Sequence, residues 1–416
     1  MTGPEAERYL LSLELFGMRF GLDRMRRLMT ALHHPERRFE SIHVVGTNGK
    51  SSTTRMIAAI LARHGLRTGA YLSPHLTSFG ERIRIDNQDL GPDEFGAAVA
   101  RAAQAAELVD RSLEADDRVT QFEALTAAAY SELAAKRVQV AVIEAGLGGR
   151  YDATNVIPSK VQVLTSVGLE HTRWLGPTLT DIAGEKLDVV QPGATLVLGA
   201  GLDPDVIAVA ERVCAQRDAT IIQAGSDPGV AVGASGTFQR RNFALARAAA
   251  EVYLGRLDDA AVAAVAHEVR VPGRLQRIDD DPLTLIDGAH NPDGMRALAE
   301  SLPELVTGHE TVVAVVSILD DKDAAGMLAA LWAGGVGINA LILTSSQNPR
   351  ALPPPTLQSL TRQLAGPPAE IVPDPHRALA RARELAGAQG VVIATGSLYL
   401  IADLLSPGRR ERASVL

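Results

Sequence analysis

The 416-residue sequence predicts an α/β protein with two domains, each built on a mostly parallel sheet covered by helices. β-Branched runs alternate with helical segments, glycine ends several of these runs, and the alternation restarts after residues 272–274 with a run that begins at residue 282. Because the chain is too long for one ordinary core, we expect a first domain at 1–276 and a smaller second domain at 282–416. The polar, non-periodic residues 277–282 mark the expected boundary.

The expected elements of the first domain follow from apolar runs and from helical composition. Residues 41–45 are typical of a short buried strand, and residues 51–63 of a helix that Gly65 closes. Residues 95–109 are rich in alanine and predict another helix. Further β-branched runs predict strands within 138–146, 160–168 and 194–201.

The second domain is expected to be a Rossmann-like α/β domain. Its strand-like runs lie within 282–292, 311–323, 340–346 and 390–397. The sequence contains no internal repeat and no heptads, so the rhythm of strands and helices is that of an ordinary layered domain.

Composition and charge exclude several classes of protein. A net charge of −8 argues against general binding to nucleic acid or to acidic membranes. The single cysteine, Cys214, cannot form an intrachain disulfide, which fits a reducing cytoplasm. Residues Glu5, Glu7 and Glu14 interrupt the apolar core that an export signal would need, and no apolar run approaches the ~20 residues of a membrane span. We therefore expect a cytoplasmic protein with no nucleic-acid or membrane partner.

The stretch SIHVVGTNGKSS at 41–52 resembles a phosphate-binding loop. The common template G-x-x-x-x-G-K-[ST] has glycine where this chain has Val44. The order of strand, glycine turn and helix still suits phosphate, because backbone N–H groups and the helix dipole favour an anion at the helix start. Lys50 would reach the β and γ phosphates, and a following hydroxyl would hold Mg²⁺. The alternative is a plain β–α turn with an exposed lysine.

Glu144 ends an apolar strand-like run and is a candidate metal ligand. A carboxylate at a strand tip beside a phosphate loop supplies the oxygen that nucleotide-bound Mg²⁺ prefers. An ordinary solvated strand end is the alternative.

A series of short motifs then points to one family. They are GTNGKSS at 46–52, YLSPHL at 71–76, ERIRID at 81–86, FEALTAAAY at 122–130, EAGLGGRYDATN at 144–155, IAGEKLDVVQPG at 182–193, PGRLQ at 272–276, DGAHNP at 287–292 and DDKD at 320–323. In this order they resemble the folylpolyglutamate synthase/dihydrofolate synthase family of Mur ligases, which form amide bonds with ATP. The resemblance covers nearly the whole chain, up to residue 400, and implies a Mur-ligase central-type ATP-binding domain followed by the C-terminal Mur-ligase domain.

The resemblance explains the short loop and implies the nucleotide contacts. The family's loop has the form G-T-N-G-K-G-S, so Val44 is no defect. Ser51 stands where the family usually has glycine, which leaves Ser51 and Ser52 as rival hydroxyls. The implied ATP-binding residues are Thr47, Asn48, Gly49, Lys50, Ser51, Ser52, Asn242, Arg274 and Asp287. Among them, a guanidinium suits phosphate and a carboxylate suits ribose hydroxyls.

The resemblance also implies a metal site with two Mg²⁺ ions. Its expected ligands are Ser73, Glu144 and His171, although Glu170 replaces the aspartate that commonly precedes this histidine. Lys186 matches a lysine that CO₂ carbamylates in the family, which turns a cation into an anion near the metal. Without the resemblance, His171 would be a surface histidine and Lys186 a solvated helix lysine.

Substrate-binding residues are implied on both domains. Phe122, Glu123, Tyr151, Asp152 and Ala153 match the pteroate-binding stretches, although Phe122 could equally belong to the core. The remaining substrate candidates are Arg82, His290 and Ser397. His290 is expected to handle the incoming amino acid and, with Lys50 and Lys186, forms the predicted catalytic set. A simple turn with an Asn-Pro break is the alternative for the segment that carries His290.

The implied reaction joins L-glutamate to dihydropteroate or to folates through an acyl phosphate. Because an acyl phosphate hydrolyses, we expect the second domain to close over the first and exclude water. A cell-wall Mur ligase is less consistent, since only 45 residues precede Gly46 where an extra substrate domain would lie. A non-catalytic nucleotide-binding regulator is the other alternative, but Lys50, Glu144 and Lys186 are all retained. We expect a monomer, and the sequence leaves the range of folate substrates open.

Overall fold

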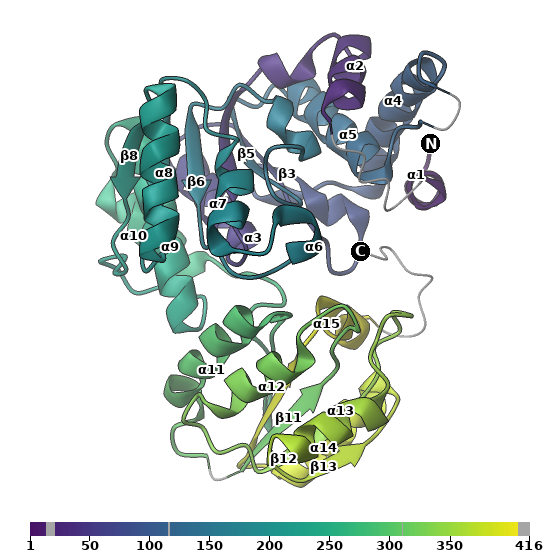
Figure 1. Cartoon of the computed structure of the whole chain (residues 1–416), viewed down its shortest axis with the longest axis vertical. Coiled ribbons are helices and arrows are strands. Elements are labelled where there is room, and N and C mark those ends of the chain that lie inside the picture. The colour runs from purple at the N-terminus through teal and green to yellow at the C-terminus, as the bar shows by residue number, and fades with distance from the viewer. Residues whose placement is uncertain (14–20, 115–116, 310, 407–416) are drawn as a thin grey trace. The chain divides into compact units, whose positions relative to one another are not determined.

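A computed structural model describes residues 1–13, 21–114, 117–309 and 311–406 (Figure 1). The chain divides into two compact units. The first contains Met1–Ala231 and Arg241–Val269, and the second contains Val232–Arg240 and the segment that begins at Arg270. Helix α9 (Thr237–Leu254) therefore begins in the second unit and continues into the first.

The first unit is built on an eight-stranded sheet with the order β4-β3-β2-β5-β1-β6-β7-β8. The strands are β1 (Glu40–Val45), β2 (Thr68–Tyr71), β3 (Ile83–Ile85), β4 (Gln88–Asp89), β5 (Val140–Glu144), β6 (Val161–Leu164), β7 (Thr195–Leu198) and β8 (Thr220–Gln223). In the sheet, neighbouring strands from β2 to β8 pair in parallel, whereas β3 pairs antiparallel with both β2 and the edge strand β4. The carboxyl ends of β5, β1 and β6 therefore meet at one edge of the sheet.

Helices cover the sheet because their apolar faces need burial. They are α1 (Gly3–Ser12), α2 (Asp23–Ala31), α3 (Lys50–Arg63), α4 (Pro92–Asp110), α5 (Gln121–Ala135), α6 (Thr172–Leu175), α7 (Leu179–Leu187), α8 (Pro204–Arg217) and α10 (Asp259–Glu268), with short 3₁₀ turns η1 (Pro35–Arg37), η2 (Phe79–Arg82) and η3 (Ala153–Val156). Small alanine side chains let α4 and α5 pack closely together. Thr120 and Thr178 start α5 and α7 with capping boxes, which fixes where these helices begin.

The second unit has a six-stranded sheet with the order β13-β12-β11-β14-β10-β9. Its strands are β9 (Gln276–Asp280), β10 (Leu283–Ile286), β11 (Val312–Val316), β12 (Ala340–Leu343), β13 (Ala369–Ile371) and β14 (Val391–Thr395). Its helices are α11 (Pro292–Val306), α12 (Ala324–Trp332), α13 (Pro354–Gln363), α14 (Pro375–Ala386) and α15 (Leu398–Leu405). Only β9 is antiparallel, and it pairs with β10.

The predicted fold class is confirmed: both units are α/β layers with mostly parallel sheets. The domain limits 1–276 and 282–416 stay a prediction. Strand β9, which overlaps the expected boundary at 277–282, pairs with β10 in the second sheet. Within the described part of the chain, no helix is long and apolar enough to cross a membrane.

Candidate functional site

The predicted phosphate loop lies between β1 and α3, at the carboxyl edge of the first sheet. Gly46 and Gly49 both have positive φ, at 150° and 84°. A Cβ atom at position 46 would lie 1.9 Å from the Thr165 Oγ1, so only glycine fits this turn. Helix α3 begins at Lys50, and no side chain caps its start, so its first backbone N–H groups suit an anion.

The segment that follows β6 holds this loop in place. The Thr47 N–H donates to the Ser166 carbonyl at 2.8 Å, and the Asn48 N–H donates to the Ser166 hydroxyl at 2.9 Å. The Thr165 hydroxyl donates to the Asn48 carbonyl at 2.6 Å. The Gly168 N–H donates to the Thr47 hydroxyl at 3.1 Å. These bonds fix the loop before any ligand binds, which limits the entropy lost on binding.

Two predicted nucleotide residues lie at the tip of the loop. The Lys50 ammonium donates to the carbonyls of Gly46 and Thr47 at 3.1 and 3.2 Å, so it folds back over the loop. A Cβ atom at position 49 would lie 2.6 Å from the Asn242 Oδ1, which places Asn242 directly against Gly49. The structure thus brings Asn242, almost 200 residues away in the sequence, to the predicted loop.

Glu144 lies beside the loop because β5 pairs with β1, with Val44 opposite Glu144. Its side chain is buried. One carboxylate oxygen accepts a hydrogen bond from the Ser51 hydroxyl at 2.9 Å, and the other accepts one from the Ser73 N–H at 3.1 Å. Two of the predicted residues, Ser51 and Ser73, therefore bond to the carboxylate of a third, Glu144.

The other predicted metal and nucleotide residues are placed differently. Ser52 is buried within α3. His171 is exposed, and its Nε2 lies 3.7 Å from a carboxylate oxygen of Glu170. Among the described residues, no group of three or more His, Cys, Asp or Glu side chains could hold a metal by itself. A metal here would need hydroxyl and phosphate oxygens in addition to Glu144.

Lys186 lies on α7 and is buried beneath the loop. Its side-chain nitrogen donates to the Gly46 carbonyl at 2.9 Å. Burial, together with the nearby positive charge of Lys50, lowers the pKa of Lys186 to about 7. A large share of this amine is therefore neutral at physiological pH.

Phe122 and Asp152 both lie against Gly146, two residues after Glu144. A Cβ atom at position 146 would lie 2.7 Å from the Phe122 ring and 3.1 Å from an Asp152 carboxylate oxygen. Burial raises the pKa of Asp152, whereas hydrogen bonds from Thr154 and from the Leu147 N–H oppose this shift. Ala153 is buried at the start of η3, and Tyr151 is exposed.

Glu123 and Arg82, also predicted to bind substrate, already have protein partners. Both Glu123 oxygens accept hydrogen bonds from the Arg24 Nε, at 3.1 and 3.0 Å, and one of them also caps α5 through Thr120. Arg82 is buried, and its Nε donates to the His75 Nδ1 at 2.8 Å. Both side chains therefore help to hold neighbouring residues in place.

The predicted residues of the second unit gather at the carboxyl ends of β10 and β14, which pair in parallel. Buried Asp287 accepts hydrogen bonds from the N–H groups of Leu275 and Ala289, at 2.9 and 2.8 Å. Burial raises the pKa of Asp287, and the charge of Arg274 offsets part of that shift. We call Arg274, Asp287, His290 and Ser397 the second-unit cluster.

The last two members of this cluster are held by local contacts. The His290 ring donates through Nδ1 to the Gly288 carbonyl at 2.9 Å. The Ser397 hydroxyl caps α15 by accepting from the Tyr399 N–H at 3.1 Å.

Sequence reasoning missed the groups that support the loop and the Asp152 segment. Thr165 and Ser166 lie within the predicted strand run 160–168 and directly follow β6, and their position beside the loop could have been inferred from parallel pairing of that strand with 41–45. The buried contact between the His43 Nε2 and the Thr154 hydroxyl, at 2.8 Å, left no signal, because it joins residues 111 positions apart. The Thr154 hydroxyl also donates to Asp152, so His43 supports that carboxylate indirectly.

Comparisons with known proteins identify relatives of this chain. A family model described as Mur ligase, glutamate ligase domain, matches residues 273–398. Folylpolyglutamate synthase of Lacticaseibacillus casei is 36% identical over 406 residues, which cover 90% of this chain and 92% of the relative.

Two solved structures extend the likeness to the fold. Mycobacterium tuberculosis folylpolyglutamate synthase in complex with ADP has a TM-score of 0.88 and 32% identity, with 96% of each chain covered. The bifunctional folylpolyglutamate synthase/dihydrofolate synthase of Yersinia pestis, in complex with AMPPNP and a Mn ion, has a TM-score of 0.83 and 30% identity, with 97% of each chain covered.

The two α/β units and the relatives show that this is an ATP-dependent ligase of the Mur type. Within that class, the chain belongs to the folylpolyglutamate synthase/dihydrofolate synthase family.

Proposed function

We propose that this enzyme joins the α-amine of L-glutamate to the carboxylate of dihydropteroate or of a folate, with ATP as the activating substrate. The observation that carries the proposal is the meeting of Lys50, Ser51, Glu144 and Lys186 around one glycine loop. A loop lysine, a buried acid and a near-neutral lysine together suit phosphoryl transfer to a carboxylate. The names of its relatives, which include folylpolyglutamate synthase and dihydrofolate synthase, supply the identity of the acceptors.

The chemistry must overcome a poor electrophile and a protonated amine. A carboxylate oxygen of the pteroyl substrate attacks the γ-phosphorus of ATP, and ADP leaves, giving an acyl phosphate. Lys50 lies where it can neutralise the phosphate charge that otherwise repels this nucleophile. The neutral amine of glutamate then attacks the acyl carbon, and phosphate leaves as the amide forms.

The residues around the loop fit a divalent cation. Glu144 and the Ser51 hydroxyl offer oxygen ligands 2.9 Å apart, which is the ligand chemistry that Mg²⁺ prefers. Among the two rival hydroxyls, we assign this role to Ser51, because Ser52 is buried within α3. Ser73 and His171 are assigned as further ligands. The cation, when bound, neutralises phosphate charge during transfer.

Lys186 is proposed to carry a carbamate. Carbamate formation requires a neutral amine, and burial with the charge of Lys50 lowers the pKa of this amine to about 7. The nitrogen lies 2.9 Å from the Gly46 carbonyl, so an added carboxylate would be held close to the phosphate loop. An anion there would offset the charge of Lys50 and support the cation at Glu144.

The remaining assignments are divided between the two units. Phe122 and Asp152 are proposed to bind the pteroyl group, with Ala153 and Tyr151 beside them, while Glu123 and Arg82 act by holding neighbouring side chains. In the second unit, Arg274 and Asp287 are proposed to contact nucleotide, and His290 and Ser397 to contact glutamate.

A product assay tests the proposal. The enzyme is incubated with ATP, Mg²⁺ and L-glutamate, and dihydropteroate and tetrahydrofolate are offered separately. We expect mass spectrometry to show a product one glutamyl residue heavier and ADP release that depends on glutamate. ADP release without a glutamylated product from either acceptor would overturn the proposal, and the acceptor that reacts defines the substrate range.

A further inference from the structure

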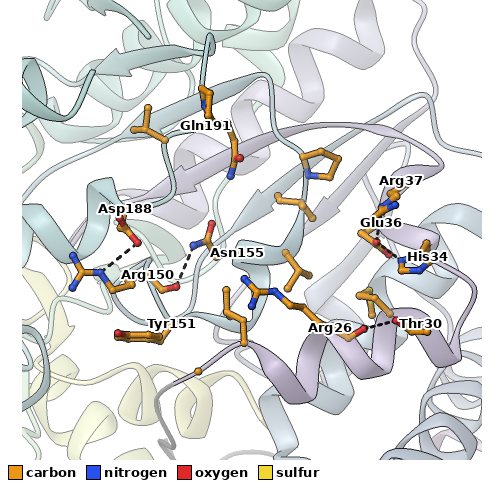
Figure 2. A pocket seen from close by; sticks show the side chains of 18 of the residues that line it. Arg26, Thr30, His34, Glu36, Arg37, Arg150, Tyr151, Asn155, Asp188 and Gln191 are labelled. Carbon is orange, nitrogen blue, oxygen red and sulfur yellow. Dashed lines mark hydrogen bonds and ion pairs between the residues drawn. The ribbon is translucent and has the colours of Figure 1, made fainter. Parts of the chain in front are cut away.

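The first unit contains a second potential ligand site, away from the phosphate loop. It is a pocket of about 1030 Å³, lined by residues of α2 and η1, residues 150–151 and 155–158, Asp188, residues 190–192 and Arg217 (Figure 2). The segments that line it directly precede β1, β6 and β7, so the pocket lies at the amino ends of these strands. The phosphate loop follows the other end of β1, about 20 Å away for a six-residue strand.

The pocket is strongly basic, although the whole chain is acidic. Its lining includes Arg26, Arg37, Arg150 and Arg217 but only two acids, Glu36 and Asp188. Both acids are already paired: Glu36 with Arg37 at 3.3 Å, and Asp188 with Arg150 at 3.3 Å and also with Arg217. The lining therefore has a surplus of positive charge in a protein whose net charge is −8.

Arg26 is the pocket arginine whose guanidinium could bind a ligand. Figure 2 shows its side chain reaching from α2 into the pocket toward Asn155. Among the described residues, its guanidinium has no hydrogen bond and no ion pair, whereas the other three pocket arginines each have a carboxylate partner. A guanidinium offers a planar fork of donors that matches a carboxylate.

The other side chains of the pocket indicate which kind of anion fits it. Between the arginines the wall carries apolar side chains such as Met29, Ile157 and Val190 as well as polar ones. Such a surface suits methylene groups that alternate with carboxylates rather than a compact inorganic anion. A γ-linked glutamyl chain has this composition, with one free α-carboxylate and two methylene groups in each residue.

We propose that this pocket binds the oligo-γ-glutamyl tail of a polyglutamylated folate, with Arg26 as the main carboxylate contact. The naming of the tail rests on the proposed function, whereas the carboxylate chemistry rests on the pocket alone. Residues 150–158 belong to the segment that begins at Glu144 and carries Asp152. A bound tail would thus contact the segment that supports the reaction site and would hold long-chain products on the enzyme.

The test measures binding of a fluorescein-labelled tetra-γ-L-glutamate peptide, which lacks a pterin, to the full chain by fluorescence anisotropy. We expect saturable binding that weakens with salt, and an affinity lower by roughly ten-fold in Arg26→Gln. Arg27→Gln is the matched control, because Arg27 is the next residue of α2, pairs with Asp23 at 2.8 Å and does not line the pocket. This variant should bind within about two-fold of the wild type.

Three outcomes would overturn the proposal: equal affinity in the wild type and Arg26→Gln, equal losses in both variants, or displacement of the peptide by inorganic phosphate at a concentration equal to that of the peptide. Ligation of glutamate to a monoglutamyl folate is measured on the same preparations and should be unchanged in Arg26→Gln. If the wild type binds the peptide through Arg26 but does not ligate glutamate, the proposed function fails while the carboxylate site stands.

Discussion

The phosphate-loop region and the second-unit cluster are built in contrasting ways. Around the loop, side chains from distant parts of the chain contact one another, as Ser51 does with Glu144 and Lys186 with the Gly46 carbonyl. In the second-unit cluster, Asp287, His290 and Ser397 mainly bond to backbone groups within a few residues or on an adjacent turn. Long-range contacts preorganise charge for chemistry, whereas local contacts fix turns and helix starts. The two regions should therefore respond differently to mutation.

The largest expected effect is on Lys50. Lys50→Ala should lower the rate of ligation by about 10³-fold, because charge on the transferred phosphoryl group is no longer neutralised. Lys160→Ala is the control. Lys160 is exposed and pairs with Glu40 at the start of β1, away from the loop, so its removal should leave activity unchanged. Steady-state kinetics and circular dichroism provide the measurement. A folded Lys50→Ala enzyme with wild-type turnover would show that the loop does not do this chemistry.

Substitution of Lys186 should lower the rate of ligation nearly as much. In addition, activity that relies on Lys186 should depend on CO₂. Lys186→Ala should be inactive, and a small carboxylate such as acetate should restore part of the activity. In the wild type the pKa of Lys186 is about 7, so its amine is protonated below pH 7 and neutral above it. Activity in CO₂-free buffer should therefore rise on addition of bicarbonate at pH 8 and rise much less at pH 6.

A fully active Lys186→Ala enzyme, or equal responses to bicarbonate at both pH values, would contradict the proposal that Lys186 carries a carbamate.

Substitutions of the neighbouring residues Ser51 and Ser52 should have smaller effects, and these effects should differ from each other. Ser51→Ala should weaken the apparent affinity for Mg²⁺ by about ten-fold, because it removes a hydroxyl that bonds to Glu144 at 2.9 Å. Ser52→Ala should leave Mg²⁺ affinity unchanged, since Ser52 is buried in α3. Titration of activity with Mg²⁺ at saturating ATP distinguishes them. The reverse order of effects would move the hydroxyl ligand to Ser52.

The smallest expected effect concerns stability in the second unit. Ser397→Ala removes the N-cap of α15, which should cost about 1 kcal/mol of unfolding free energy. Ser397→Asp keeps a capping oxygen and should retain most of that stability. Thermal and urea unfolding measure the difference. Unchanged stability in Ser397→Ala would show that the helix cap contributes little to folding. It would also contradict the view that local contacts stabilise the second-unit cluster.

Much of the fold could be predicted because its central strands are buried on both faces and form continuous apolar runs. The runs at 41–45, 138–146 and 311–323 correspond to β1, β5 and β11. The short strands β2, β3, β4, β8, β9 and β13 were not predicted. Gly69 interrupts the apolar pattern in the first, and β9 is a polar edge strand in the segment that we expected to be a boundary.

The site was predictable where one short motif carries the chemistry, as in the loop at 46–52. It was not predictable where contacts join distant elements, as between Gly49 and Asn242 or between His43 and Thr154. Only the resemblance to a family placed Asn242 and Lys186 at the site in advance. The actual partners of Glu123 and Arg82 depend on packing, which no local pattern encodes.

Transfer of oxygen tests the central claim most directly. Dihydropteroate or the reactive folate, labelled with ¹⁸O in its carboxylate, is converted with ATP and glutamate, and the released phosphate is analysed by mass spectrometry. Because a carboxylate oxygen bonds to the γ-phosphorus and leaves with it, we predict one ¹⁸O atom in each phosphate for each amide formed. Unlabelled phosphate with full amide yield would contradict carboxylate activation through an acyl phosphate.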